Sequence, residues 1–201
     1  SRRQRQMCKE TAITATVGGK SATCEITVAE GTIVELSATE KSAKVGDSAF
    51  SLSATVNDGS DITWSLSKDG IVTLDNTSGG SVSVTPVGSG SVNVIATANG
   101  VSESCTVTVG LDQSAIKLEK GTSATVSAGT SSVTWSTSNA SVATVENGVI
   151  TAVDDGTATV TATNSDGESS SVTVTVFTYT EISFTSVTLV GSGQVQFAGN
   201  T

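Results

Sequence analysis

The sequence predicts an all-β protein built from tandem β-sandwiches, and three observations support this prediction. The 201 residues include 20 Gly, one Pro and only 3% aromatic residues, and Ser, Thr and Val are the commonest residues. Thr and Val are β-branched, which favours extended strands. Runs such as 81–84 and 173–176 alternate polar and apolar residues at period two, as strands with one buried face do. Finally, the same pattern recurs along the chain, which indicates repeated modules.

The repeat can be aligned by counting residues. At an offset of 66, six residues of one copy match six of the other: Thr85, Val87, Gly90, Val94, Ala96 and Thr97 match Thr151, Val153, Gly156, Val160, Ala162 and Thr163. At an offset of 81, the segment around Cys24 matches the segment around Cys105. Near the C-terminus, VGSGQVQF (190–197) lines up with VGDSAFSL (45–52). Two copies are therefore complete, and each end of the chain carries part of another.

These residues resemble a known family. Trp135 is followed by SNASVATVENGVITAVDDGTATVTA (138–162), and a weaker copy runs from Trp64 to TPVGSGSVNVIAT (85–97). Together they resemble the bacterial immunoglobulin-like domain, group 2, which occurs in tandem on bacterial surface proteins and on tailed-phage virions. The resemblance implies immunoglobulin-like Greek-key β-sandwiches in an elongated array.

The alignment predicts four segments in chain order. Residues 1–29 form a basic tail plus the closing hairpin of an incomplete module, and 30–109 form a complete module. Residues 110–177 form a second complete module, and 178–201 hold the opening strands of a further, incomplete one. Turn signals such as Asn-Gly and Asp-Gly separate the short strands, as in a sandwich.

Five residues are predicted to be structural core. Trp64 and Trp135 are expected to anchor equivalent strands of the two modules. Cys24 and Cys105 are in phase with neighbouring Ile and Val residues, and Val172 occupies the equivalent position of the last copy. Since free Cys behaves as a small apolar residue, both thiols are expected in module cores. Cys8 lies outside the repeat and is a candidate reactive thiol.

The sequence offers little for catalysis, and we expect neither an enzyme nor a cofactor. It contains no His, which excludes Ser-His-Asp and Cys-His arrangements and most zinc sites. Two acidic pairs, Asp58 with Asp61 and Asp154 with Asp155, are weak candidates for calcium. Their spacing does not match a dedicated calcium loop, so turn formation is the favoured interpretation.

Charge limits the partners. The net charge is −9 with a pI near 4.3, which argues against nucleic acid. The short basic run Arg2-Arg3-Gln4-Arg5 is interpreted as a solvated tail. No apolar segment approaches the ~20 residues of a membrane span. The C-terminal aromatic residues Phe177, Tyr179 and Phe184 are candidates for binding a host-surface carbohydrate, although the start of the next module is the favoured interpretation.

Two functions remain, both structural. In the first, the chain is an accessory or decoration protein on a tailed-phage virion that attaches weakly to surfaces. The absence of a secretory signal and the start at Ser1 favour this expectation. In the second, it is a spacer or stalk segment of a secreted adhesin on the bacterial cell surface or outside the cell, which the partial copies at both ends favour. Strand addition from other chains of the same assembly is expected at 11–28 and 178–201.

Overall fold

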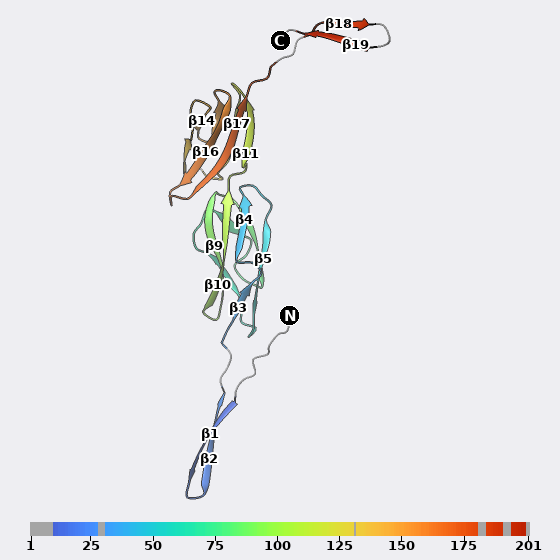
Figure 1. Cartoon of the computed structure of the whole chain (residues 1–201). Coiled ribbons are helices and arrows are strands. Elements are labelled where there is room, and N and C mark those ends of the chain that lie inside the picture. Colours follow the sequence, from blue (N-terminus) through green and yellow to red (C-terminus); the bar gives the residue numbers. More distant parts are fainter. Residues whose placement is uncertain (1–9, 28–30, 131, 181–183, 191–193, 200–201) are drawn as a thin grey trace.

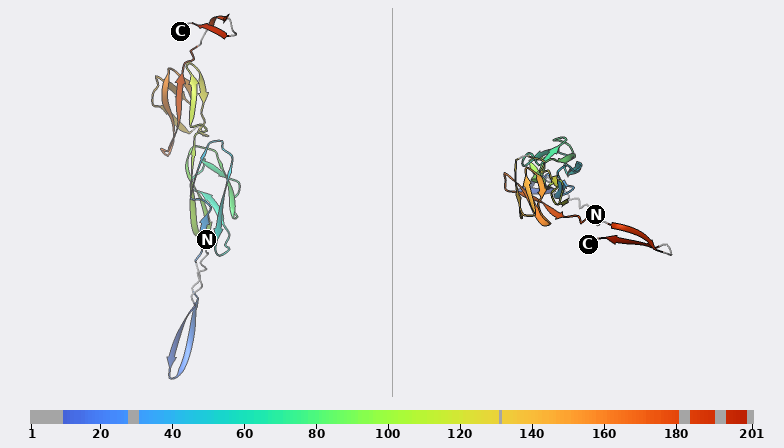
Figure 2. Two further views of the ribbon diagram at one scale, coloured as in Figure 1. Left: turned by 45° about the vertical axis from the view of Figure 1, so that its right-hand side comes forward. Right: turned by 90° about the horizontal axis from the view of Figure 1, so that it is seen from above.

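A computed structural model describes residues 10–27, 31–130, 132–180, 184–190 and 194–199. Every regular element among them is a β-strand, so the predicted all-β class is confirmed. Two sandwiches lie end to end, with a two-stranded hairpin beyond each (Figure 1; Figure 2). The predicted tandem arrangement is therefore present in the structure.

The first sandwich consists of two four-stranded sheets, in the orders β4-β10-β9-β6 and β3-β5-β8-β7. Its strands are β3 (Val34–Leu36), β4 (Glu40–Lys44), β5 (Phe50–Val56), β6 (Thr63–Leu66), β7 (Val72–Leu74), β8 (Ser81–Pro86), β9 (Gly90–Ala98) and β10 (Val101–Gly110). Asn99 and Gly100, with φ of 48° and 80°, join β9 to β10. Positive φ at both central residues matches the right-handed twist of a hairpin.

The second sandwich has a four-stranded sheet, β11-β17-β16-β13, and a three-stranded sheet, β12-β15-β14. Its strands are β11 (Ala115–Glu119), β12 (Ser123–Thr125), β13 (Val133–Thr137), β14 (Ala143–Glu146), β15 (Val149–Ala152), β16 (Gly156–Asn164) and β17 (Ser169–Phe177). Each sandwich has one sheet with a parallel pair, β4 with β10 and β11 with β17, in which the opening strand of the sheet lies beside its closing strand.

Each sandwich has its own apolar core. Buried and partly exposed residues alternate along β9 and β17, as the period-two sequence pattern predicts. The first core includes Leu52, Val84 and Val94, and the second includes Ile150 and Val160. Two separate cores in one chain are what independent modules require.

The connection between the sandwiches is short. Strand β10 ends at Gly110, whose carbonyl accepts a hydrogen bond from the Val45 amide of the first sandwich. The next residue, Leu111, is 3% exposed and belongs to the second core. Adjacent residues are therefore anchored in different sandwiches.

The terminal hairpins pack differently from the equivalent strands of the sandwiches. Strands β1 (Glu10–Val17) and β2 (Lys20–Thr27) pair with each other, as β9 and β10 do, but no second sheet covers them in the described residues. At the other end, β18 (Phe184–Val190) pairs with β19 (Gln194–Gly199). Their sequence equivalents in the first sandwich, β4 and β5, lie in opposite sheets.

Candidate functional site

The structure separates the predicted core residues into three groups. Trp64, Cys105 and Val172 are buried, at 3%, 0% and 0% exposure. Burial also raises the pKa of the Cys105 thiol. Trp135 is only half-buried and packs at the margin of the second core.

Cys24 differs from the prediction, because it is exposed. It pairs with Ile13 across the β1–β2 hairpin, and Ile13 is itself 57% exposed. The sequence phase correctly places Cys24 on the apolar face of its hairpin. That face has no covering sheet among the described residues, so the thiol meets solvent. Cys8 and the Arg2-Arg3-Arg5 tail lie outside the described residues.

The first acidic pair forms a turn. Asp58 accepts hydrogen bonds from the Ser60 amide at 2.9 Å and the Thr32 hydroxyl at 2.6 Å. Hydrogen bonds from Ser60 and Thr32 lower the pKa of Asp58 to about 2. Because donors already occupy both oxygens of Asp58, this carboxylate acts as a turn cap.

The second acidic pair is also engaged by donors. Lys120 lies 2.7 Å from Asp154, and its hydrogen bond lowers the pKa of that carboxyl. Asp155 accepts a hydrogen bond of 2.7 Å from the Thr178 hydroxyl. Across the described ranges, no three His, Cys, Asp or Glu side chains converge as a metal site would require. Nor do these ranges hold a helix able to cross a membrane.

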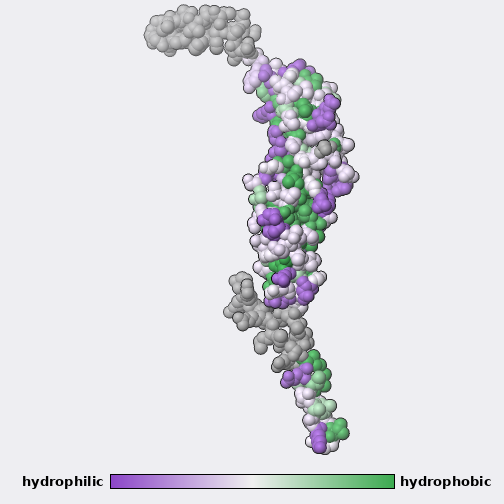
Figure 3. Space-filling view, turned by 180° about the vertical axis from the view of Figure 1, so that it is seen from behind, coloured by the Kyte–Doolittle hydropathy of each residue, from purple (hydrophilic) through white to green (hydrophobic). Residues whose placement is uncertain are grey.

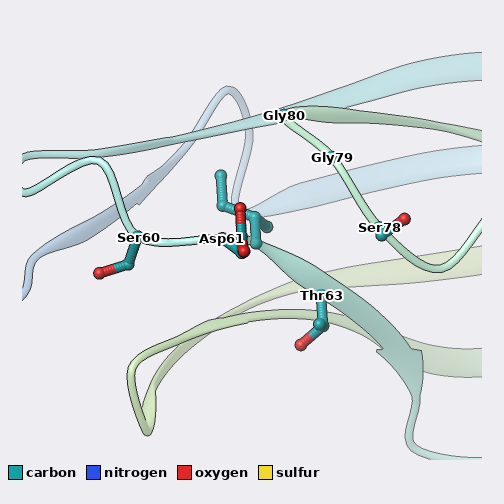
Figure 4. A pocket seen from close by; sticks show the side chains of 7 residues that line it. Ser60, Asp61, Thr63, Ser78, Gly79 and Gly80 are labelled. Carbon is teal, nitrogen blue, oxygen red and sulfur yellow. The ribbon is translucent and has the colours of Figure 1, made fainter.

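A shallow hollow lies beside Trp64. It is lined by the segment Ser60–Thr63 on one side and by Ser78–Gly80 on the other (Figure 4). The hydroxyls of Ser60, Thr63 and Ser78 point in different directions in Figure 4 and do not converge. Asp61 supplies the carboxylate of the hollow, without a second titratable group lining it. The hollow therefore lacks the paired groups that acid–base catalysis uses.

The most elaborate polar cluster lies where the two sandwiches meet. Lys68 of the first sandwich lies 2.8 Å from Asp166 and 2.8 Å from Glu168 of the second. One oxygen of Glu168 also accepts hydrogen bonds from the Ser91 amide at 3.1 Å and the Asn164 side chain at 2.9 Å. This carboxylate is thus held by donors from both sandwiches.

The pKa values at this junction follow from these contacts. Hydrogen bonds to Asp166 and Glu168 raise the pKa of Lys68. Partial burial acts to raise the pKa of Glu168, but the hydrogen bonds from Lys68, Asn164 and Ser91 together lower it below its usual 4.5. Both partners are therefore stabilised in their charged forms.

Small residues bring the two backbones together at the same junction. The Ser89 amide donates to the Ala128 carbonyl at 2.8 Å, and Ser89 is 4% exposed. A Cβ atom on Gly129 would lie 1.8 Å from the Val87 carbonyl oxygen, so a larger residue does not fit there. No sequence pattern predicts this cluster, because Lys68 and Glu168 are 100 residues apart and belong to no chemical motif.

Comparison with known families bears on the second sandwich. Residues 117–176 match the family described as bacterial Ig-like domain (group 2). This stretch belongs to that family. The resemblance seen in the sequence is confirmed for these residues, which form most of the second Ig-like sandwich. No curated protein matches the chain.

Several solved structures are similar at low identity. A C-terminal fragment of intimin, in complex with the intimin-binding domain of its translocated receptor, has 17% identity and a TM-score of 0.33, over 71% of this chain and 62% of that one. Domains 1–6 of the surface layer protein SbsC have 17% identity and a TM-score of 0.32, over 93% and 36%. Drosophila N-cadherin EC1–4 has 17% identity and a TM-score of 0.29, over 87% and 59%. The chain thus spans less than two thirds of each of these chains.

Proposed function

We propose that this Ig-like protein is a non-catalytic spacer that displays attached segments away from a surface. The observation that carries the proposal is the junction. Lys68 and the Ser89 amide bind the second sandwich directly, so the two modules stack end to end (Figure 1). The chain enters the first sandwich at the end away from the second and leaves the second at its far end. Each module therefore adds length.

The absence of His from the sequence supports a non-catalytic role. Asp58 caps a turn, Asp154 pairs with Lys120, and Asp155 accepts a hydrogen bond from Thr178. The hollow that Asp61 lines does not bring reactive groups together. A fold of this kind hosts many functions, so the role has to be argued from such sites.

Small-angle scattering of the intact chain tests the spacer role. We expect an extended particle whose maximum dimension falls when residues 110–177 are deleted. Placed between a cell-surface anchor and a fluorescent tag, the intact chain should hold the tag farther from the surface than the deleted chain does. A compact particle, or a tag height that the deletion leaves unchanged, would contradict the proposal.

For the carrier surface, we propose the tailed-phage virion, with the bacterial cell surface as the alternative. The family resemblance supports an exposed outer surface, because such modules occur on both carriers. Electron microscopy with an antibody against the chain separates the two. Antibody labelling of phage particles would support the virion as the carrier. Labelling of the bacterial cell envelope would contradict it and support the bacterial surface.

Assembly through the terminal hairpins is a second candidate function. The β1–β2 hairpin exposes Ile13, Val17 and Ile26 at 57%, 84% and 40% (Figure 3, green residues at the lower end). The equivalent face of β9–β10 packs on the sheet of β5 and β8, so opening strands from another chain are the fitting partner. Hydrogen exchange tests this: slow exchange of the Ile13 and Ile26 amides in an assembly supports it. Exchange within seconds in a sedimenting monomer contradicts it.

A carbohydrate partner is a weaker proposal. Phe177 and Tyr179 stack edge to face, with ring centroids 4.9 Å apart, and Tyr179 is 68% exposed. The side chain of Phe184 lies outside the described residues. Glycan-array binding that is lost in Tyr179→Ala would support this proposal, and equal binding by the variant would remove it.

A further inference from the structure

We infer that the two sandwiches carry mechanical tension along the chain, because each is closed by a parallel strand pair that an end-to-end pull loads in shear. The inference rests on the proposed spacer function and deepens it. A spacer between a surface and its ligand is stretched whenever the ligand is held. The direction of the strands relative to that pull decides how the hydrogen bonds are loaded.

The parallel pair has the same construction in both sandwiches. Residues Glu40–Lys44 of β4 lie beside Thr106–Gly110 of β10, and Ala115–Glu119 of β11 lie beside Thr173–Phe177 of β17. In each sandwich the second strand of the pair ends where the chain leaves, and the first strand is the opening strand of the same sheet. In the first sandwich the chain enters through β3 of the other sheet and then continues into β4 (Figure 1). We call these two pairs the clamps.

Further backbone hydrogen bonds extend each clamp at both ends. In the first sandwich, the Thr106 amide donates to the Thr39 carbonyl at 2.9 Å and the Val45 amide donates to the Gly110 carbonyl at 3.0 Å. In the second sandwich, the matching bonds are Thr173 to Ser114 at 3.0 Å and Lys120 to Phe177 at 2.9 Å.

The clamp strands are also fixed to the cores. On β10, Val107 and Val109 are fully buried, and on β17, Val174 and Val176 are 0% and 3% exposed. Sliding β10 or β17 lengthwise would therefore disturb apolar packing as well as the ladder of hydrogen bonds. Both contributions resist the same displacement.

The geometry of the pull follows from the strand directions. The strands run along the long axis of the stack (Figure 1). Tension reaches β4 through β3, and it pulls the start of β4 one way and the end of β10 the other, parallel to both strands. Because the bonds of a parallel ladder lie across this direction, they are loaded together and must fail together. A hairpin pulled at its two open ends loses its bonds one at a time.

The two terminal hairpins are pulled at their open ends in this way. Glu10 faces Thr27 at the open end of β1–β2, and Phe184 faces Gly199 at the open end of β18–β19. An end-to-end pull separates each of these pairs directly. The terminal hairpins should therefore open first, and the sandwiches should open later at higher force.

Single-molecule force spectroscopy on the full chain tests the inference. With handles at both termini, we expect two high-force events. The first clamp encloses residues 39–110 and the second 114–177, so their extension steps differ by eight residues, or about 28 Å at ~3.5 Å per residue. In a second geometry, the N-terminal handle is moved to the exposed Thr157, which faces Thr175, and the other handle stays at the C-terminus. The pull then opens β16–β17 as a hairpin.

The rupture force of the second sandwich should be several-fold lower with the handle at Thr157 than with both handles at the termini. Equal forces in the two geometries would overturn the inference. Such a result would leave the spacer role intact, since scattering measures length without load.

A single substitution can remove one backbone hydrogen bond of the second clamp. Lys120 is the second residue of a turn closed by the Thr122 amide and the Glu119 carbonyl, with Gly121 at φ 85°. This is the pattern of a type II turn, which accepts Pro at the second position. Lys120→Pro should therefore fold and lose only its amide bond to Phe177 and its ion pair with Asp154.

Lys120→Ala is the matched control, because it loses the ion pair and keeps the amide. We expect Lys120→Pro to lower the force of the second event and leave the first sandwich, in the same molecule, unchanged. Lys120→Ala should leave both events at the wild-type force. An unchanged second event in Lys120→Pro, or an equal loss in Lys120→Ala, would also overturn the inference.

Discussion

The two sandwiches pack the same anchor, a Trp on the edge strand β6 or β13, in different ways. Trp64 is 3% exposed, and its indole nitrogen donates to the Gly79 carbonyl at 2.8 Å. Trp135 is half-buried and rests against the backbone of Gly148, where an added Cβ would lie 3.3 Å from its ring. One repeat pattern therefore supports two packing solutions.

The difference comes from chain length between the strands. Twenty residues lie between Trp64 and Thr85, and fifteen lie between Trp135 and Thr151. Most of the additional residues of the first sandwich lie in the loop 75–80, in which the carbonyls of Thr77 and Gly79 accept hydrogen bonds from the amide and the indole of Trp64. In the second sandwich, Asn147 and Gly148 alone join β14 to β15. A longer loop thus covers an edge strand and its Trp, and a tight turn covers only the ring.

The largest expected effect separates the two anchors directly. Trp64→Ala should cost ~3–5 kcal/mol, the usual range for removing a buried aromatic side chain. Trp135→Ala should cost about 1–3 kcal/mol, because part of its surface already meets water. Hydrogen exchange of amides in β9 and β16 measures the free energy of unfolding of each sandwich separately. Equal losses would show that the loop adds nothing to the anchor.

The second prediction concerns the tight turn. Gly148 and Gly167 both have φ of 81°, but a Cβ on Gly148 would lie 2.5 Å from the Val126 carbonyl oxygen, whereas Gly167 has open space. Gly167→Ala should cost ~1–2 kcal/mol from backbone strain alone. Gly148→Ala should cost more, because the turn cannot approach Val126 and Trp135. Thermal melts of the two variants test this, and similar melting temperatures would mean that the contact is easily relaxed.

The third prediction compares two lysines. Lys68 links the sandwiches, while Lys120 pairs with Asp154 inside the second. Lys68→Ala should destabilise the intact chain by about 0.5–1 kcal/mol, the scale of partly exposed ion pairs. Lys120→Ala should change the melting temperature little. Calorimetry measures both, and a larger loss in Lys120→Ala would reverse this ranking.

The stability that the same junction contributes should decrease as the pH falls into the acidic range. The pKa of Glu168 in the folded chain lies below its usual 4.5. Its contribution to stability is therefore complete above pH 4.5 and is lost as the pH falls through the lowered pKa. The difference in stability between wild type and Lys68→Ala should shrink over that acidic window. A difference that stays constant in acid would show that Glu168 does not carry it.

The smallest expected effect is that of calcium on either sandwich. Asp58 of the first and Asp154 of the second already accept hydrogen bonds from Ser60 and Lys120. Millimolar calcium should therefore leave both melting transitions unchanged, since a ligand stabilises only by occupying the native state. A rise that Asp58→Asn or Asp155→Asn removes would favour a calcium-binding turn instead.

Much of the fold could be predicted from the sequence because the repeat and the strand period are both local patterns. The alternation in 81–84 and 173–176 gave correct strands, and the alignment of Cys105 with Val172 identified two fully buried positions. The unequal burial of Trp64 and Trp135 was not predicted. The alignment shows that five residues are added, but not where their backbone bonds go.

The junction and the exposure of Cys24 depend on contacts that no local pattern encodes. Lys68 meets Glu168 only because the second sandwich turns its 164–168 loop toward the first. The phase of Cys24 shows which face of its hairpin it occupies, but burial depends on whether another sheet covers that face. Local periodicity predicts orientation, and only the complete packing decides exposure.

The placement of Gly110 and Leu111 couples the stabilities of the two sandwiches. Gly110 pairs within the first sandwich and Leu111 is buried in the second core, so unfolding of one sandwich releases a residue adjacent to an anchor of the other. In such a linear array, stability is the sum of a contribution from each repeat and a coupling between adjacent repeats. A sandwich with neighbours on both sides gains two couplings and a terminal one gains a single coupling. Fraying should therefore begin at an outer repeat and proceed inward.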